Sequence, residues 1–213
     1  MLLYYITDRA QFPGTEAQRR ERLMKTISEA AAAGVDYIQL REKDLSGRAV
    51  ESLAEQAVQL IRDSRSSSHL LINSRTDIAL AAKAHGVHLT SSDISALEVK
   101  RIWRETQPSG PIIAVSCHSE AAVIAAESAS DGSSAEFAVF GPIFEKHGSG
   151  GMPAGLSELR RVCSHQIPVL ALGGVTMENA HLCIEAGASG IAGIRLFQEN
   201  NVTAVVTKLR GLK

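Results

Sequence analysis

The stretch Val35-Asp36-Tyr37-Ile38-Gln39-Leu40-Arg41-Glu42-Lys43 gives the clearest indication of the fold. Its first half is a short apolar run, which predicts a buried strand over Tyr37–Leu40. Gln39, Arg41 and Lys43 follow at the end of that strand. An amide, a planar guanidinium and an ammonium group together suit a phosphate or diphosphate better than an apolar ligand. For this stretch alone, a charged loop without a ligand is an equally good interpretation.

A short apolar run followed by a longer amphipathic one recurs along the whole chain. The predicted strands are Leu2–Thr7, Tyr37–Leu40, Leu70–Asn73, Val87–Thr90, Ile112–Cys117, Phe137–Phe140, Val169–Leu172 and Ile191–Ile194. The predicted helices are Gln18–Ala33, Gly47–Asp63, Asp77–Ala84, Ala96–Thr106, Glu120–Ser128, Leu156–Cys163, Met177–Ala186 and Val202–Arg210. Such alternation is typical of parallel strands joined by helical crossovers.

The number of repeats favours a closed barrel over an open sheet. The 213 residues hold roughly one strand–helix pair every 27 residues, which suits a single (β/α)8 TIM barrel spanning residues 1–213. The competing fold is an open, doubly wound sheet, which usually has a glycine-rich turn after its first strand. The segment Thr7-Asp8-Arg9-Ala10 has no glycine, so we expect the barrel.

Composition excludes several classes of function. The net charge of -1 argues against a general nucleic-acid or membrane-surface binder. Three cysteines cannot form a complete disulfide framework, so reduced thiols and a cytoplasmic location are expected. The apolar start Met1–Ile6 is interpreted as a strand rather than a signal peptide, and no apolar run is long enough for a membrane span. A homo-oligomer is compatible with the sequence, which identifies no interface.

Functional groups gather in the loops that follow the predicted strands. In a barrel these loops share one rim, where enzymes of this fold have their active sites. The loops at this rim contain Asp8, Gln39, Arg41, Lys43, Asn73, Arg75, Asp93, His118, Lys146, His147, Gly173, Gly174 and Arg195. The opposite loops contain mostly Gly, Ser and Pro. This asymmetry predicts an enzyme that acts on small molecules.

Two glycine-bearing loops at this rim predict a phosphate site. Gly173 and Gly174 follow the seventh predicted strand and precede a helix, so their backbone can approach an anion closely. Gly190–Gly193 and then Arg195 occupy the matching position on the eighth strand. Loops seven and eight often bind phosphate in these barrels, although tight packing at a barrel corner also uses glycine.

Histidines at the rim are candidates for acid–base chemistry. His118 ends the fifth predicted strand beside Ser116, so a general acid–base role is as well supported as a structural one. His85 and His88 flank or lie within the fourth strand, and both are interpreted as packing residues. His118, with Ser116, is therefore the preferred catalytic candidate.

Three further residues complete the predicted site. Asn73 ends the third strand. Asp93 is either a helix N-cap or one oxygen ligand of Mg²⁺, and from the sequence alone the cap is preferred. Lys146 lies in the glycine-containing loop of residues 141–155, which is predicted to be a lid with Lys146 as its anion contact.

Several motifs in a fixed order carry a family resemblance. They are Tyr5-Ile6-Thr7-Asp8, Gln39–Lys43, Ile72–Asp77, Gly86–Leu89, Val115–Ser119, Gly141–Phe144, and Gly173–Val175 with Asn179. Together they cover nearly the whole chain and resemble the thiamin phosphate synthase / thiazole tautomerase superfamily. Synthase members join an aminopyrimidine methyl diphosphate to a thiazole phosphate. Pyrophosphate leaves first, and the thiazole nitrogen captures the resulting pyrimidine-methyl cation.

The resemblance implies a role for each predicted site residue. The implied ligands of the pyrimidine diphosphate are Gln39, Arg41, Lys43 and Asn73. Asp93 is implied as the Mg²⁺ ligand, and Ser116 as a hydrogen-bonding group near the reacting atoms. The thiazole phosphate is implied to bind the backbone of Gly173 and Gly174. This chemistry is mostly electrostatic stabilisation of departing pyrophosphate.

Three departures from the synthase pattern keep other functions open. Ser74 stands where synthases usually have an aspartate metal ligand, and Arg195 stands where a small Ser is usual. The segment 145–151 lacks the lid motif Pro-Thr-x-Thr-Lys, with Lys146 as the candidate replacement for its lysine. A metal-independent tautomerase that uses His118 is the first alternative. A non-catalytic binder of phosphorylated ligands is the second, and the synthase is preferred.

Overall fold

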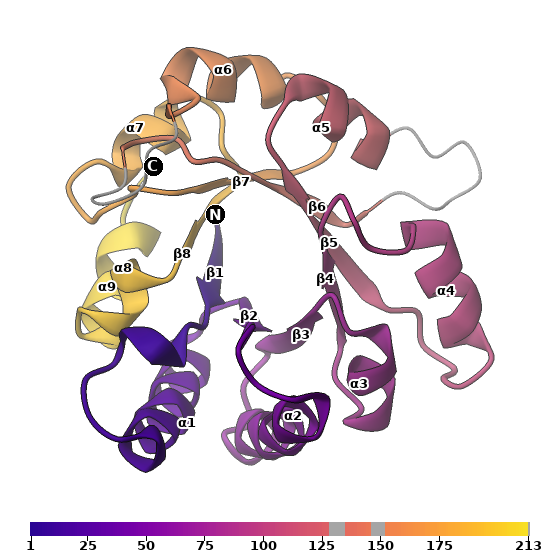
Figure 1. Ribbon diagram of the computed structural model, residues 1–213. Coiled ribbons are helices and arrows are strands. Elements are labelled where there is room, and N and C mark those ends of the chain that lie inside the picture. Colours follow the sequence, from indigo (N-terminus) through magenta and orange to yellow (C-terminus); the bar gives the residue numbers. More distant parts are fainter. Residues whose placement is uncertain (128–134, 146–151, 213) are drawn as a thin grey trace.

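The short apolar strands stand side by side in a closed ring with the helices around it, as Figure 1 shows for the computed structural model. The structure describes residues 1–127, 135–145 and 152–212. The strands follow one another around the ring in chain order and are all parallel, and β1 pairs with β8 to close it. The predicted (β/α)8 TIM barrel is confirmed, and the open doubly wound sheet is excluded.

The element boundaries are close to those predicted. The strands are β1 (Leu2–Ile6), β2 (Tyr37–Leu40), β3 (His69–Asn73), β4 (Gly86–Leu89), β5 (Ile112–Cys117), β6 (Phe137–Phe140), β7 (Val169–Leu172) and β8 (Gly190–Gly193). The helices of the first half are the 3₁₀-helix η1 (Arg9–Gln11), α1 (Glu16–Ala33), α2 (Gly47–Asp63), α3 (Thr76–Ala81) and α4 (Ala96–Arg104). Those of the second half are α5 (Glu120–Glu127), α6 (Gly155–Val162), α7 (Ala180–Glu185), α8 (Arg195–Gln198) and α9 (Val202–Arg210).

Local capping explains where the predictions missed. Helix α1 begins earlier than predicted because Thr15 and Gln18 form a capping box. Helix α7 begins later than predicted because Asn179 and Thr176 bond each other's backbone N–H groups in a turn that replaces its first residues. The short helices η1 and α8 were not predicted, since three or four residues carry no usable periodicity.

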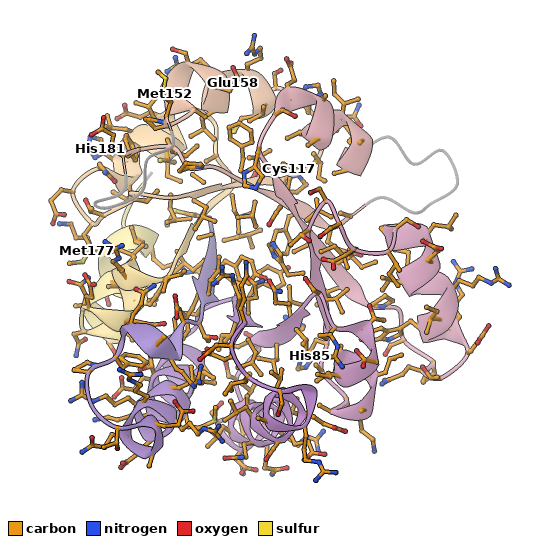
Figure 2. All side chains as sticks on the ribbon, in the orientation of Figure 1. His85, Cys117, Met152, Glu158, Met177 and His181 are labelled. Carbon is orange, nitrogen blue, oxygen red and sulfur yellow. The ribbon has the colours of Figure 1, made fainter. Side chains whose placement is uncertain are left out.

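Alternate residues of each strand point into the barrel. Apolar side chains among them fill its interior. The inward-facing apolar layer consists of Tyr4, Ile6, Leu71, Ala114, Phe137, Val139, Leu170 and Ala192. Within it, the ring of Phe137 packs against those of Tyr4 and Tyr37, with centroids 5.4 and 4.7 Å away. Figure 2 shows side chains filling the centre of the ring of strands. These aromatic rings fill the barrel interior below the polar residues at the carboxyl ends of the strands.

Outward-facing strand residues pack against the surrounding helices in a second, larger apolar cluster, which includes the fully buried Trp103 of α4. Burial of both apolar clusters gives the barrel its hydrophobic stabilisation. None of the helices in the described part of the chain combines the length and the apolar character that a membrane span requires.

Candidate active site

A cavity of about 720 Å³ opens at the carboxyl ends of the strands. Most of the predicted site residues line it, whereas Asp8, Arg75 and Asp93 do not, and those that line it come from five different strands or the loops after them. Those residues are Gln39, Arg41, Lys43, Asn73, Ser116, His118, Gly173, Gly174 and Arg195. The fold therefore brings the predicted site together, and the role of each residue stays a prediction. Lys146, predicted as a lid contact, lies outside the described residues.

Three cations at the cavity have no acidic partner among the residues that the structure describes. Arg41, Lys43 and Arg195 form no ion pair with any of the residues that the structure describes. Glu145, Glu178 and Glu199 also line the cavity, as does Met177, which is labelled in Figure 2. Unneutralised cations in a concave site raise the local concentration of anionic ligands. The cavity is therefore suited to an anion.

A buried carboxylate fixes the loop that carries Arg41 and Lys43. Glu42 lies between them, and its side chain is only 1% exposed. Thr7 Oγ1 donates to Glu42 Oε1 over 2.6 Å, and Arg9 binds Glu42 Oε2 through its backbone N–H and its guanidinium, at 3.0 and 3.1 Å. Burial raises the pKa of Glu42, and these donors oppose the shift. With Glu42 directed into the protein, its two basic neighbours are left at the cavity.

A one-way chain of hydrogen bonds links β2 to the loop after β4. Gln39 Nε2 donates to Asn73 Oδ1 over 2.8 Å, and Asn73 Nδ2 donates to Ser74 Oγ over 3.0 Å. Ser74 Oγ in turn donates to Asp93 Oδ2 over 2.8 Å. A carboxylate only accepts, so the Ser74 hydroxyl must donate to Asp93. Ser74 then has no proton left for Asn73, so the Asn73 amide donates to Ser74 and its oxygen accepts from Gln39. Gln39 uses its Nε2 in this chain, and its side-chain oxygen Oε1 forms no hydrogen bond with the described residues.

Asp93 is not the helix N-cap that the sequence favoured. Ser95 caps α4, in a capping box with Glu98. Asp93 Oδ2 instead accepts from the backbone N–H and the hydroxyl of Thr90, at 2.6 and 2.9 Å, besides Ser74. Three donors hold this one oxygen, and no described residue donates to Oδ1. The carboxylate is thus positioned at the rim with one oxygen available.

The glycine loop after β7 takes a conformation that side chains disfavour. Gly173 and Gly174 have φ values of +95° and +67°. A Cβ at Gly174 would lie 2.7 Å from the Glu145 carbonyl oxygen and 2.7 Å from Phe144 Cβ. The loop after β6 thus packs directly on this glycine. Among the described residues, the backbone N–H groups of Gly174 and Val175 have no acceptor, so both can bind an anion.

His118 is oriented by the backbone. Its Nδ1 lies 2.6 Å from the carbonyl oxygen of Gly141, which can only accept, so Nδ1 carries a proton. In the neutral ring Nε2 then has a free lone pair. His118 is exposed and lines the cavity, so Nε2 can exchange a proton with a ligand.

His88 packs inside the barrel, as the sequence indicated, but it also reaches the cavity. His88 is buried, yet it lines the cavity floor, with Nε2 2.7 Å from Ser116 Oγ and Nδ1 3.0 Å from Tyr4 Oη. Burial, and secondarily Arg41, lowers the pKa of His88 to about 3, while Asp93 opposes the shift. The strand register pairs His88 with Asn73, a predicted site residue, and this in-phase position is the signal that could have identified it.

The fold and the site define a (β/α)8-barrel protein with a cavity at the carboxyl ends of its strands, lined by Arg41, Lys43 and Arg195. The family model described as thiamine monophosphate synthase matches residues 3–197. The chain belongs to this family, which places it among the transferases of thiamine biosynthesis.

Individual relatives agree with this assignment. A thiamine-phosphate synthase of Methanoculleus marisnigri is 36% identical over 214 residues, covering 98% of this chain and 93% of its own. One from Clostridium acetobutylicum is 35% identical, covering 90% and 84%. The solved thiamine phosphate pyrophosphorylase from Pyrococcus furiosus superposes with a TM-score of 0.80 at 28% identity, covering 99% of this chain and 94% of that one.

Proposed function

We propose that this protein joins an aminopyrimidine methyl diphosphate to a thiazole phosphate and releases pyrophosphate. The observation that carries the proposal is that two separate groups of donors suited to anions line one cavity. One consists of Arg41 and Lys43 after β2, and the other of the glycine loop after β7 with Arg195 after β8. A reaction between two phosphorylated substrates requires two such regions around a shared reacting centre.

The β2 region suits the diphosphate. The Arg41 guanidinium can bind two of its oxygens at once, and Lys43 adds a point charge. As the carbon–oxygen bond breaks, negative charge grows on the departing pyrophosphate, and these cations stabilise it without reorganising. The free carbonyl oxygen of Gln39 provides an acceptor for an amino group on the same substrate.

The β7–β8 region suits the thiazole phosphate. The N–H groups of Gly174 and Val175, together with the Arg195 guanidinium, offer donors for a phosphate dianion. With its phosphate fixed there, the thiazole ring can lie over the cavity floor and present its nitrogen to the pyrimidine carbon. The thiazole nitrogen attacks through its own lone pair, so this step requires no general base.

The residues present fit a Mg²⁺ ion that is held mainly by the diphosphate. No group of three or more His, Cys, Asp or Glu side chains within the described residues could hold a metal ion. Asp93 Oδ1 remains available, and one carboxylate plus waters and substrate phosphates is a usual Mg²⁺ coordination. When bound, Mg²⁺ supplies further neutralisation of the leaving pyrophosphate.

The free thiols support a cytoplasmic location.

The direct test is incubation of purified protein with both substrates, with and without Mg²⁺. Formation of thiamin phosphate and pyrophosphate in equal amounts is expected. Binding of both substrates without turnover, in the presence of Mg²⁺, is the result that would overturn the proposal.

A second candidate function follows from His118. With Nδ1–H held by Gly141, its Nε2 has the orientation and the free lone pair that moving a proton on a thiazole carboxylate phosphate requires. This is the tautomerase chemistry of the superfamily, and it needs no metal. Metal-independent isomerisation of the thiazole, abolished in His118→Gln, would support it. The same substitution is expected to leave synthase turnover within about threefold, because that reaction needs little acid–base work.

A further inference from the structure

A buried polar relay crosses the barrel interior below the cavity. It consists of Tyr4 on β1, His88 on β4 and Ser116 on β5. Tyr4 is fully buried, His88 is 2% exposed, and Ser116 is half-buried at the cavity. Nothing in the proposed reaction uses Tyr4 or His88. Buried polar groups in an otherwise apolar layer are costly, so their presence calls for a functional reason.

The direction of the relay follows from hydrogen-bond satisfaction. The buried Tyr4 hydroxyl has one proton to donate, and His88 Nδ1 is its only polar partner within the described residues. A buried hydroxyl proton without an acceptor is unfavourable, so Tyr4 donates and Nδ1 accepts. The neutral ring then carries its single proton on Nε2, which donates to Ser116 Oγ over 2.7 Å. The Ser116 hydroxyl proton is left to point elsewhere.

We infer that Tyr4 and His88 are positioning residues that fix Ser116 as a hydrogen-bond donor toward a substrate acceptor atom in the cavity. Without the relay the serine hydroxyl can rotate freely and can equally accept from the ligand. With it, one lone pair of Oγ is occupied and the proton is directed into the cavity. This role for Ser116 rests on the proposed function, whereas the tautomer of His88 does not.

The first test therefore measures the tautomer without any reaction. Protein labelled with ¹⁵N in its histidines is examined by NMR at neutral pH, with His88→Gln used to assign the ring. A protonated Nε2 and an unprotonated Nδ1 are expected for His88. In Tyr4→Phe, which removes the donor to Nδ1, a mixture of the two tautomers is expected. A proton on Nδ1 in the unsubstituted protein would overturn the proposal, whatever the enzyme's activity.

The second test is a double-mutant cycle between His88 and Ser116 in the synthase reaction. Ser116→Ala is expected to lower kcat by roughly 100-fold, and His88→Phe by roughly 10- to 100-fold, because each removes the directed donor. Since His88 acts only through Ser116, His88→Phe is expected to cost less than twofold further in the Ser116→Ala background. Multiplicative losses would show that His88 acts independently and would overturn the proposal.

Two controls separate positioning from simple packing. His88→Gln keeps an N–H donor near Ser116, so its kcat is expected to be at least tenfold higher than that of His88→Phe. His85 is a half-buried histidine at the opposite rim, where its Nδ1 accepts from the Leu70 N–H. His85→Gln is expected to lower thermal stability and leave kcat within twofold. If His88→Gln is no better than His88→Phe, the directed donor is not the cause of the loss.

Discussion

The two sides of the cavity offer different kinds of donors for the anions of the proposed reaction. On the β2–β4 side the polar groups are side chains that orient one another, from Gln39 through Asn73 and Ser74 to Asp93. On the β7 side, backbone N–H groups of the glycine loop take the corresponding part, and packing of the loop after β6 holds them. A side-chain network can be altered by one substitution or by protonation. A backbone site changes only when its conformation changes.

The strongest effect is expected from removing the guanidinium group of Arg41, on the β2–β4 side of the cavity. Arg41→Ala should lower kcat/KM for the pyrimidine diphosphate by about 100- to 1,000-fold, since no other described group replaces its bidentate contact. The KM for the thiazole phosphate should change by less than about threefold. Steady-state kinetics with each substrate varied in turn provides the measurement.

Arg104→Ala is the matched control for Arg41→Ala, because Arg104 is exposed near the end of α4 and does not line the cavity. It should leave both kinetic constants unchanged. Equal losses toward both substrates in Arg41→Ala would contradict the division of the cavity into two anion-binding sides.

The backbone side should respond to a single added methyl group. Gly174→Ala places a Cβ 2.7 Å from Glu145 O in a residue with φ of +67°. We expect the loop to shift and the Kd for the thiazole phosphate to rise by about 100-fold, with a smaller effect on binding of the diphosphate. Titration calorimetry with the thiazole phosphate alone checks this.

Gly34→Ala separates backbone strain from this clash. Gly34 also has a positive φ, +84°, but a Cβ there meets nothing within 4 Å. That variant should lose about 1 kcal/mol of unfolding free energy and keep full affinity for the thiazole phosphate. Unchanged affinity in Gly174→Ala would mean that the loop does not bind the phosphate.

The same division explains which features could be predicted from the sequence. Arg41 and Gly174 were identified because local signals reveal them, namely a strand end and a glycine pair before a helix. The relay was missed because its members are far apart in sequence, with Tyr4 and His88 separated by 84 residues. Only the barrel register brings them together, and a histidine inside a short strand has the same local pattern whether it packs or functions.

Asp93 shows a different limit of sequence-based prediction. An aspartate shortly before a helix fits the N-cap pattern, but Ser95 directly precedes the helix and has Glu98 three residues later, which is the local signature of the capping box that the structure shows. Asp93 is held instead by Thr90 in its own loop and by Ser74, which directly follows β3. The contact with Ser74 is nonlocal, so this part of the environment of Asp93 could not be predicted from the local pattern.

A moderate effect is expected from changing the centre of the side-chain network. Ser74 has φ of +60°, a conformation that Asp and Asn tolerate. In Ser74→Asp the new carboxylate cannot donate to Asp93, so two like charges face each other and favour a divalent cation between them. The Mg²⁺ concentration for half-maximal synthase activity should fall about tenfold, and Mg²⁺ should raise the melting temperature of the substrate-free variant.

Ser74→Asn is the control, because its amide can still donate to Asp93 and adds no charge. It should show no Mg²⁺-dependent rise in melting temperature. The same melting behaviour in Ser74→Asp as in the unsubstituted protein would argue that residue 74 does not face the metal position.

The smallest effect is the pH dependence of the unfolding free energy. It should arise from His88, below the side-chain network, rather than from the glycine loop. Burial lowers the pKa of His88 to about 3 in the folded protein, against about 6.5 when unfolded. Between these values the unfolded chain binds more protons, so unfolding free energy falls as pH falls and is fully retained above the unfolded value. The expected loss from His88 alone is about 0.7 kcal/mol between pH 7 and pH 6, and about 2 kcal/mol by pH 5.

Urea unfolding at pH 7, 6 and 5 measures this effect. His88→Gln should remove the His88 share of the pH dependence, so its curve is flatter than that of the unsubstituted protein even if its stability at pH 7 is lower. His181→Gln serves as the control, because His181 is exposed on α7, as Figure 2 shows, and should leave the slope unchanged. Equal slopes in all three proteins would mean that His88 is accessible to protons in the folded state, and the floor of the site would then be wetter than its burial indicates.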